Sequence, residues 1–312
     1  MTENTNIYIE TSSPHIHRGD STHTIMRDVL IALLPALIAA IFIFKMEAVF
    51  VIALSIVSCT LTEFLWQKIF RQDITVKDLS ATVTGVLLAF TLPPSVPFYI
   101  PIIGGVFAIV IVKQIFGGMG KNFLNPALAS RAFLVVTWPA LMAKWTLDGL
   151  STATPLEILK SGGGSLPSIW AVFIGNIGGT IGETSALALI IGAIYLIYRD
   201  IITWEIPVTY VLSTFLLTFF FGSTSLSLEF SLYHILSGGL LLGAIFMATD
   251  YVTSPVTKLG KCIMGIGCGF LTFALRRFGA TPEGVCFSIL IMNLFVPIIN
   301  RHVIPRTFGE VK

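Results

Sequence analysis

Long apolar runs follow one another along most of the chain, separated by short polar breaks. Most are close to the roughly 20 residues that a helix needs to cross a bilayer. Two runs differ: 79–91 is short and ends in prolines, and 168–182 is interrupted by glycines and an asparagine. We therefore predict ten spans, with 168–182 as a non-spanning approach to the next helix. The runs are 25–44, 46–67, 79–91, 98–116, 126–143, 168–182, 184–198, 204–221, 232–248, 260–275 and 283–300.

The composition indicates that lipid is the solvent of this chain. Of its 312 residues 54% are hydrophobic and only 12% are charged, with a mean hydropathy of +0.87. A soluble globular domain has about 25% charged residues. Disorder, nucleic-acid binding and a disulfide scaffold are therefore excluded, and a net charge of +2 indicates no polyanionic partner. The four cysteines lie in apolar stretches without a C-x-x-C, which favours packing over metal or disulfide roles.

Lysine and arginine predict the orientation of the spans, because these residues flank cytoplasmic ends preferentially. With ten spans and a cytoplasmic N-terminus, 14 of the 19 cationic residues fall inside and 5 outside. If 79–91 did not cross, the split would be 9 against 10. We expect a multi-pass protein of the cell (inner or cytoplasmic) membrane with both termini cytoplasmic. The expected units are a cytoplasmic tail at 1–24, a first five-helix repeat at 25–143, an extracytoplasmic loop at 144–183, and a second five-helix repeat with a short cytoplasmic tail at 184–312.

The two halves resemble each other at an offset of 157 residues. Leu79-Ser80, an apolar stretch and a proline-bearing turn in the first half correspond to Leu236-Ser237 and the turn at 254–255 in the second. The match is short, so chance similarity is the alternative. Five spans per half would invert the second half relative to the first. Inverted repeats with broken helices are typical of transporters, so the predicted fold is an all-α membrane protein of about ten transmembrane helices in two inverted five-helix repeats.

Two polar segments lie on the predicted inner side. In 116–127 (FGGMGKNFLNPA), the glycines expose backbone N–H groups, the amides of Asn122 and Asn125 can pair with the edge of a heterocycle, and Pro126 suits the start of a helix. The same pattern fits a simple linker between helices. In 247–255 (MATDYVTSP), hydroxyls and the carboxylate of Asp250 fit either a binding site or ordinary capping.

A third polar segment, 148–156 (DGLSTATPL), lies in the predicted outside loop. By itself it predicts a turn and a helix start, with Thr154 as N-cap and Pro155 at the first helical position. It also resembles Asp-x-x-Ser/Thr-Gly-Ala-Thr, the recognition sequence of the flavin transferase that esterifies a threonine with FMN. Asp148, Ser151, Ala153 and Thr154 match this sequence, whereas Thr152 replaces the usual glycine.

The three segments in this order resemble the D component of the Rnf complex, and the chain is similar over its length to the B component of the sodium-pumping NADH:quinone reductase. The resemblance covers about residues 20–305, and the short N-terminal tail favours the Rnf branch. It implies a transporter- or urea-channel-like fold, with FMN bound covalently to Thr154 through a phosphoester and riboflavin or another second flavin bound non-covalently near Asn122 and Asn125. Asp148 would assist the transferase, and the hydroxyl of Thr152 could compete with that of Thr154. The full set of implied cofactor-binding residues is Thr154, Asp148, Ser151, Thr152, Ala153, Gly117, Gly118, Asn122, Asn125 and Asp250.

The implied function is that of a flavin-carrying electron-transfer subunit, with one flavin toward each face of the membrane. The isoalloxazine rings would supply the redox chemistry, and the protein would supply their position and surroundings. The complex would oxidise ferredoxin, reduce NAD and move Na⁺ or H⁺ outward. Its implied partners are an extracytoplasmic FMN subunit, a cytoplasmic NAD-binding subunit, the flavin transferase during maturation and membrane lipid, but no nucleic acid. No catalytic residue or metal site is expected in this chain. A solute channel or transporter, and a purely structural membrane anchor, are the alternatives.

Three further features have simple explanations. Glu63 and Arg131 lie near predicted inner ends of spans, where either side chain could snorkel to the interface. Glu63 is also a candidate carboxylate for an ion path, since an ionisable residue within a span is a functional candidate. Gly265 and Gly269 form a G-x-x-x-G pattern, which predicts close helix packing.

Overall fold

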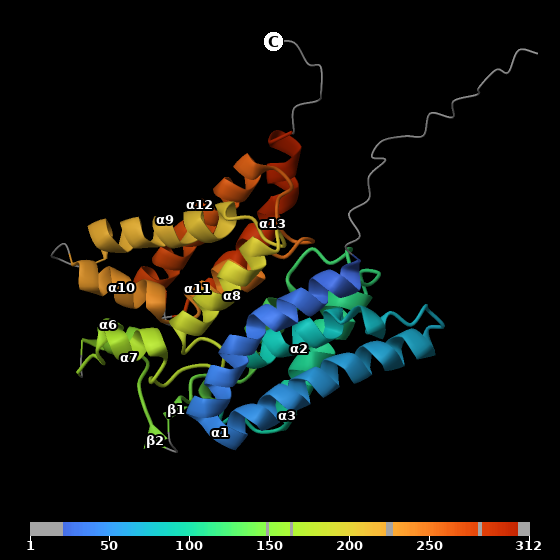
Figure 1. Ribbon diagram of the computed structural model, residues 1–312, viewed down its shortest axis with the longest axis horizontal. Coiled ribbons are helices and arrows are strands. Elements are labelled where there is room, and N and C mark those ends of the chain that lie inside the picture. Colours follow the sequence, from blue (N-terminus) through green and yellow to red (C-terminus); the bar gives the residue numbers. More distant parts are fainter. Residues whose placement is uncertain (1–20, 148–149, 163–164, 223–226, 280–282, 305–312) are drawn as a thin grey trace, which may run out of the picture.

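The computed structural model describes residues 21–147, 150–162, 165–222, 227–279 and 283–304. This part of the chain is helical apart from its loops and one short hairpin, a small exception to the all-α prediction (Figure 1). The elements, in chain order, are α1 (Thr22–Ile69), η1 (Val76–Asp78), α2 (Ser80–Phe90), α3 (Tyr99–Val106), η2 (Phe107–Gln114), α4 (Pro126–Thr137), α5 (Pro139–Met142), β1 (Thr146–Leu147), β2 (Leu150–Ser151), α6 (Pro155–Ser161), α7 (Ile169–Ile174), α8 (Ala186–Tyr198), α9 (Glu205–Phe221), α10 (Leu228–Leu236), α11 (Leu240–Leu242), η3 (Gly243–Met247), α12 (Lys258–Phe278) and α13 (Val285–His302).

Helix α1 contains the first two predicted runs, joined by a sharp bend. Lys45, with φ 55° and ψ −135°, is the one residue inside α1 with a non-helical backbone. Figure 1 shows the two limbs of α1 folding back from this bend. The predicted break between the runs 25–44 and 46–67 is therefore confirmed. The first limb begins at Ser21, whose hydroxyl accepts a hydrogen bond from the Thr24 amide, a typical N-cap contact.

Helix lengths distinguish complete spans from broken ones. Among the described residues, α1, α12 and α13 are long and apolar enough to cross a membrane, and α10 with α11 and η3 passes the same test as a pair bent by 60°. Five other apolar helices have 10–17 residues. The 11 residues of α2 cover about 16 Å, short of the roughly 30 Å hydrocarbon core. A crossing at 79–98 would thus combine a half-helix with irregular chain, and the count of ten spans stays a prediction.

Three short apolar helices, α2, α11 and η3, form the buried centre of the molecule. Ten of the 11 residues of α2 are buried, and every residue of α11 and η3 is buried. The longer helices surround them and turn large apolar side chains outward. Phe42, Phe50 and Phe220, for example, are exposed by 81%, 64% and 57%. An apolar surface around a partly polar interior is the arrangement expected of a protein dissolved in lipid.

The two central half-helices begin in a similar way. Leu79 precedes α2 with φ 65°, and Gly238 and Gly239 precede α11 with φ 69° each. A left-handed residue directly before a half-helix redirects the chain sharply. The offset of 157 positions aligns Leu79 with Leu236. The left-handed residue is Leu79 itself in the first half, and in the second half the left-handed glycines begin two residues after Leu236.

Residues 144–183 contain small ordered elements. In the hairpin, Thr146 pairs with Ser151 and Leu147 with Leu150. Helix α7 has six residues, in agreement with a non-spanning segment at 168–182. In Figure 1 the hairpin, α6 and α7 lie toward the lower left, at the same end as the bend of α1, whereas α1 begins and α13 ends on the opposite side.

Close packing of α12 on α9 confirms the prediction from the G-x-x-x-G pattern. A Cβ atom at Gly265 would overlap with the Thr209 side chain, and one at Gly269 would overlap with the Ser213 side chain. Small residues on one helix thus let the two backbones approach closely.

Gly182 provides a test of the packing at the centre. Its amide donates to the Phe90 carbonyl (2.9 Å), and a Cβ atom at Gly182 would overlap with the Phe90 side chain. We expect Gly182→Ala to destabilise the protein by about 1–3 kcal/mol, the usual cost of overpacking. Thermal unfolding in detergent measures this. Gly179→Ala is the control, because its Cβ would meet only the Thr184 methyl at 3.6 Å; equal unfolding temperatures for the two variants would contradict the prediction.

Candidate functional site

A glycine-rich turn connects η2 to α4, within the segment that the sequence singled out. Gly117, Gly118 and Gly120 have φ values of 106°, 90° and 86°, a region that only glycine adopts readily. Helix α4 then begins at Pro126 with Asn125 as its N-cap, which confirms the predicted helix start.

The two asparagines of this segment have different surroundings. The Asn125 side-chain oxygen accepts hydrogen bonds from the amides of Ala127 (3.1 Å) and Leu128 (3.3 Å), and its side-chain nitrogen donates to the Met247 carbonyl (3.3 Å). Its amide group is therefore engaged at both ends and fixes α4 against η3. Asn122 donates to the Leu124 carbonyl (3.0 Å). Both side chains are buried.

A cavity brings together residues from both inner segments. Asn122 and Asn125 line it from one segment and Asp250 from the other, while Gly117 and Gly118 lie outside its lining. Its walls are largely apolar, from α1, α2, α8 and η3, and its cavity volume is about 100 Å³. Mostly apolar walls with a few convergent polar groups are typical of small-molecule sites. The polar side chains that line the cavity are Ser80, Thr84, Lys113, Asn122, Asn125, Thr249 and Asp250.

Asp250 lies in the loop that follows η3. Its carboxylate accepts hydrogen bonds from the Val252 amide (3.4 Å) and the Thr253 hydroxyl (3.2 Å). Burial raises the pKa of Asp250, although these two hydrogen bonds act to lower it. The contacts match the capping interpretation of this segment, and the position on the cavity wall matches the binding interpretation.

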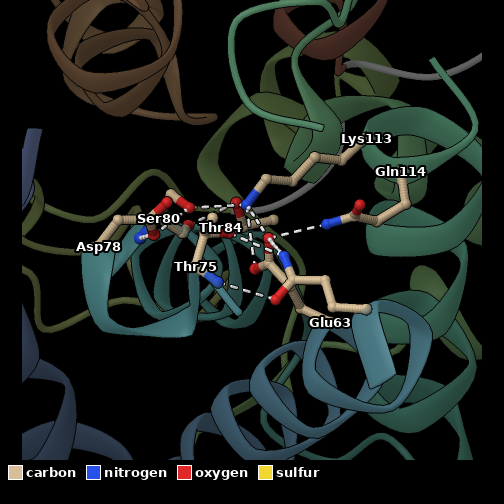
Figure 2. Close-up of polar contacts among 8 residues, drawn as sticks. Glu63, Thr75, Asp78, Ser80, Thr84, Lys113 and Gln114 are labelled. Carbon is tan, nitrogen blue, oxygen red and sulfur yellow. Dashed lines mark hydrogen bonds and ion pairs between the residues drawn. The ribbon is translucent and has the colours of Figure 1, made fainter. Parts of the chain in front are cut away.

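Figure 2 shows a set of polar residues that we call the inner polar cluster. Three of its members, Ser80, Thr84 and Lys113, also line the cavity. The Lys113 ammonium contacts the Glu63 carboxylate at 2.8 and 3.0 Å and the Ser80 hydroxyl at 2.6 Å. Gln114 donates to the same carboxylate (2.8 Å), and Ser80 donates to Asp78 (2.6 Å). Four elements thus contribute to one hydrogen-bonded network. Its members are Glu63, Gln67, Thr75, Asp78, Ser80, Thr84, Lys113 and Gln114.

This cluster corrects the interpretation of Glu63. The side chain is 1% exposed and is paired with Lys113, so it does not snorkel to an interface. A role in an ion path stays a prediction. Lys113 was counted as a flanking cation, yet its side chain is buried and lines the cavity. A lysine inside an apolar run was the sequence signal for this site.

Thr154 is the N-cap of α6, with Pro155 at the first helical position, as predicted. Its hydroxyl oxygen accepts from the Glu157 amide (3.3 Å), and its amide donates to the Glu157 carboxylate (3.1 Å). This reciprocal pair is a capping box, whose Thr-x-x-Glu pattern was present in the sequence. Gly162, with φ 68°, ends α6.

The neighbours of Thr154 form a small polar pocket, with contributions from Thr180, Glu183, Ser237 and Glu283. The Ser237 hydroxyl is buried without a hydrogen-bond partner among the described residues. The Thr152 hydroxyl has none within this part of the chain either. Ala153 is exposed. Asp148 lies outside the described residues, and Ser151 pairs through its backbone in the hairpin.

Arg131 is the centre of a second buried cluster, which sequence reasoning missed. Its guanidinium donates to the Thr91 carbonyl (2.7 Å), to Glu183 (3.1 Å) and to Glu283. We call Arg131, Thr91, Glu183 and Glu283 the Arg131 cluster. Arg131 is 4% exposed, so its side chain does not reach the membrane interface, which corrects the suggestion from the sequence that it could snorkel there. Its partners are 40, 52 and 152 residues away, so no local pattern could reveal them.

The Arg131 cluster lies between the two candidate sites. Glu183 and Glu283 line both the pocket beside Thr154 and a second pocket that Arg131 and Met247 share. The Met247 carbonyl in turn accepts from Asn125, which lines the inner cavity. Along α4, Arg131 is about 9 Å from Asn125, at 1.5 Å per residue.

Comparison with known proteins gives a consistent family. The model of the NQR2, RnfD, RnfE family matches residues 9–309. The D component of the Na(+)-translocating ferredoxin:NAD(+) oxidoreductase complex of Acetobacterium woodii is 49% identical over 308 residues, 96% of this chain and 95% of the relative. The proton-translocating counterpart of Clostridium ljungdahlii is 41% identical over 97% of each chain. The D component of an ion-translocating oxidoreductase complex of Escherichia coli is 32% identical over 96% of this chain and 98% of the relative. The chain belongs to the NQR2, RnfD and RnfE family.

Proposed function

We propose that this chain is the flavin-carrying electron-transfer component of a membrane complex that couples ferredoxin oxidation and NAD reduction to Na⁺ or H⁺ translocation. The names of the A. woodii and C. ljungdahlii relatives support the reaction and differ in the ion, so the ion is left open. The other subunits of that complex are the proposed partners. Within the complex this chain would conduct electrons and would have no complete activity alone.

The observation that carries the proposal is the position of Thr154 in a segment matching the flavinylation sequence. Its side chain is half-buried, and its hydroxyl oxygen acts as an acceptor toward Glu157. A hydroxyl has one proton to give and two lone pairs, so esterification removes the donor and leaves the oxygen at the N-cap. Beside it, the Ser237 hydroxyl, which has no hydrogen-bond partner among the described residues, offers a hydrogen bond to a bound group. We therefore assign covalent FMN to Thr154.

The inner cavity fits a second, non-covalent flavin. Lys113, Ser80, Asn122 and Asp250 present donors and acceptors from an otherwise apolar wall, which suits a planar heterocycle with a polar edge. Asn125 has a different role from Asn122. Because its amide is engaged at both ends, we assign it to positioning α4 and η3 rather than to direct contact with the ring.

The arrangement of the two sites supports electron transfer through the protein. The Arg131 cluster borders both the pocket of Thr154 and the pocket of Met247, so the two cofactors would flank one buried region. We further propose two inverted five-helix repeats with both termini cytoplasmic. The matched left-handed turns before α2 and α11 support the repeats. The orientation is supported by Figure 1, where α6 lies at one end of the molecule and the start of α1 and the end of α13 lie at the other.

The covalent flavin is tested on a denaturing gel under ultraviolet light, with the chain expressed alongside its flavin transferase. We expect a fluorescent band from the wild type and from Thr152→Val, and no band from Thr154→Val, because a valine has no oxygen to esterify. Loss of the band in Thr152→Val alone would move the attachment site. A wild type without any band would contradict the proposal and favour the channel or anchor alternatives, both of which expect no flavin.

A further inference from the structure

A groove lies beside the pocket of Thr154 and shares Glu283 with it. Its walls include Val135, Met142, Trp145 and Phe287, and its polar lining residues include Arg131 and Glu283. The cavity volume of the groove is about 150 Å³. Nothing assigned so far to the proposed function uses this groove.

Glu157 connects the groove to the proposed attachment point. It lines the groove, and the same residue exchanges both hydrogen bonds of the capping box with Thr154. A group tethered to the Thr154 oxygen therefore starts one residue away from the groove. A phosphate and a ribityl chain are long and flexible enough to cross that separation.

The pocket that Thr154 itself lines suits a ring system poorly. Its cavity volume is about 20 Å³, against about 150 Å³ for the groove. Glycines line it tightly: a Cβ atom at Gly178 would already overlap with the Thr152 hydroxyl. It also faces the carboxylate of Glu183, whereas Glu283 borders both the pocket and the groove. A planar three-ring group fits the wider, mostly apolar groove better.

The chemistry of the groove matches the two ends of an isoalloxazine ring. The dimethylbenzene end is apolar and stacks favourably on aromatic side chains, which Trp145 and Phe287 provide. The pyrimidine end alternates carbonyl acceptors with an N–H donor. Arg131 offers N–H donors and Glu283 a carboxylate acceptor at the groove.

We propose that this groove, which we call the ring groove, holds the isoalloxazine ring of the FMN on Thr154 against Trp145 and Phe287. The proposal rests on the proposed function, because it requires covalent FMN at Thr154. It adds the residues that seat the ring, and it places the ring next to Arg131 and hence toward the inner site.

The experiment measures the native fluorescence of the flavinylated chain in detergent and its quenching by iodide. A tryptophan in contact with isoalloxazine quenches its fluorescence, and a seated ring is shielded from iodide. We expect Trp145→Leu to raise native fluorescence several-fold and to increase iodide quenching. Trp170→Leu is the matched control, because Trp170 is 72% exposed on α7, away from the groove. Ala143→Phe is a second variant that fills the groove from an exposed position without removing core packing, and it should also expose the ring to iodide.

The denaturing gel separates the possible failures. If every variant has a fluorescent band, but Trp145→Leu and Ala143→Phe match Trp170→Leu in fluorescence and iodide quenching, the ring groove is overturned while the covalent flavin stands. If the wild type has no band, the proposed function fails and the ring groove fails with it. A band in all variants, together with increased iodide quenching in Trp145→Leu and Ala143→Phe only, supports the ring groove.

Discussion

Arg131→Met is expected to destabilise the protein by at least about 3–5 kcal/mol, the usual cost of removing one partner from a buried ion pair. The change leaves the carboxylates of Glu183 and Glu283 without their guanidinium, and the Thr91 carbonyl without its donor. These three groups come from three separate segments, so the loss should loosen the centre of the fold. Thermal unfolding of the detergent-purified chain, with the yield of monodisperse protein, measures the effect.

Two variants control for the Arg131 result. Arg27→Met removes a longer contact (3.8 Å) to Asp28 from an arginine side chain that is 52% exposed, and it should cost about 1 kcal/mol or less because Asp28 keeps its pair with Arg199. Arg131→Lys keeps the charge but loses the planar fork that reaches three acceptors, so its stability should fall between the wild type and Arg131→Met. An Arg131→Met protein that unfolds at the same temperature as Arg27→Met would contradict a central role for the cluster.

Lys113→Met is expected to have the second-largest effect, again about 3–5 kcal/mol. Lys113 and Glu63 are both buried, and their atoms approach to 2.8 Å. Without the ammonium, the Glu63 carboxylate retains only amide donors such as Gln114, and the Ser80 hydroxyl loses its donor. Glu63→Gln should cost a similar amount, because it leaves a buried ammonium without a counter-charge. Thermal unfolding is again the measurement.

The double variant Glu63→Gln with Lys113→Met tests whether the two residues act as a pair. Replacing both charges removes the unbalanced charge that either single variant creates. The double variant should therefore lose less free energy of unfolding than the sum of the two single losses. Additive effects would show that the two side chains stabilise the protein independently, and that would contradict the ion pair as the source of the stability.

Local signals in the sequence predicted the local features well. Pro126 after Asn125, and Pro155 after Thr154, both mark helix starts, because an N-cap side chain and a fixed proline φ act within a few residues. The spacing of Gly265 and Gly269 predicted a close helix contact for the same reason, since four residues make about one turn. The break at Lys45 separated two apolar runs that a continuous helix could not keep within one bilayer thickness.

The cationic residues show where sequence reasoning was incomplete. Lys113, Arg131 and Arg276 were counted as flanking charges, yet all three are buried. The Arg276 guanidinium donates to the carbonyls of Ser237 (3.3 Å) and Gly238 (3.2 Å) at the break between α10 and α11. Without these three residues, the count of cationic residues changes from 14 inside and 5 outside to 12 inside and 4 outside. The predicted orientation is unchanged, because it depends on the remaining loop residues.

By itself, the sequence determined the solvent of this protein, the starts of key helices, the family and the candidate attachment residue, because composition, capping and motif spacing act locally along the chain. Only the tertiary structure decided which charges are buried together. Arg131 meets Glu183 and Glu283, and Lys113 meets Glu63, across 50 to 152 residues of sequence. An isolated charge in an apolar interior is too costly to persist, so its partner is chosen by how the helices pack, which no local pattern records.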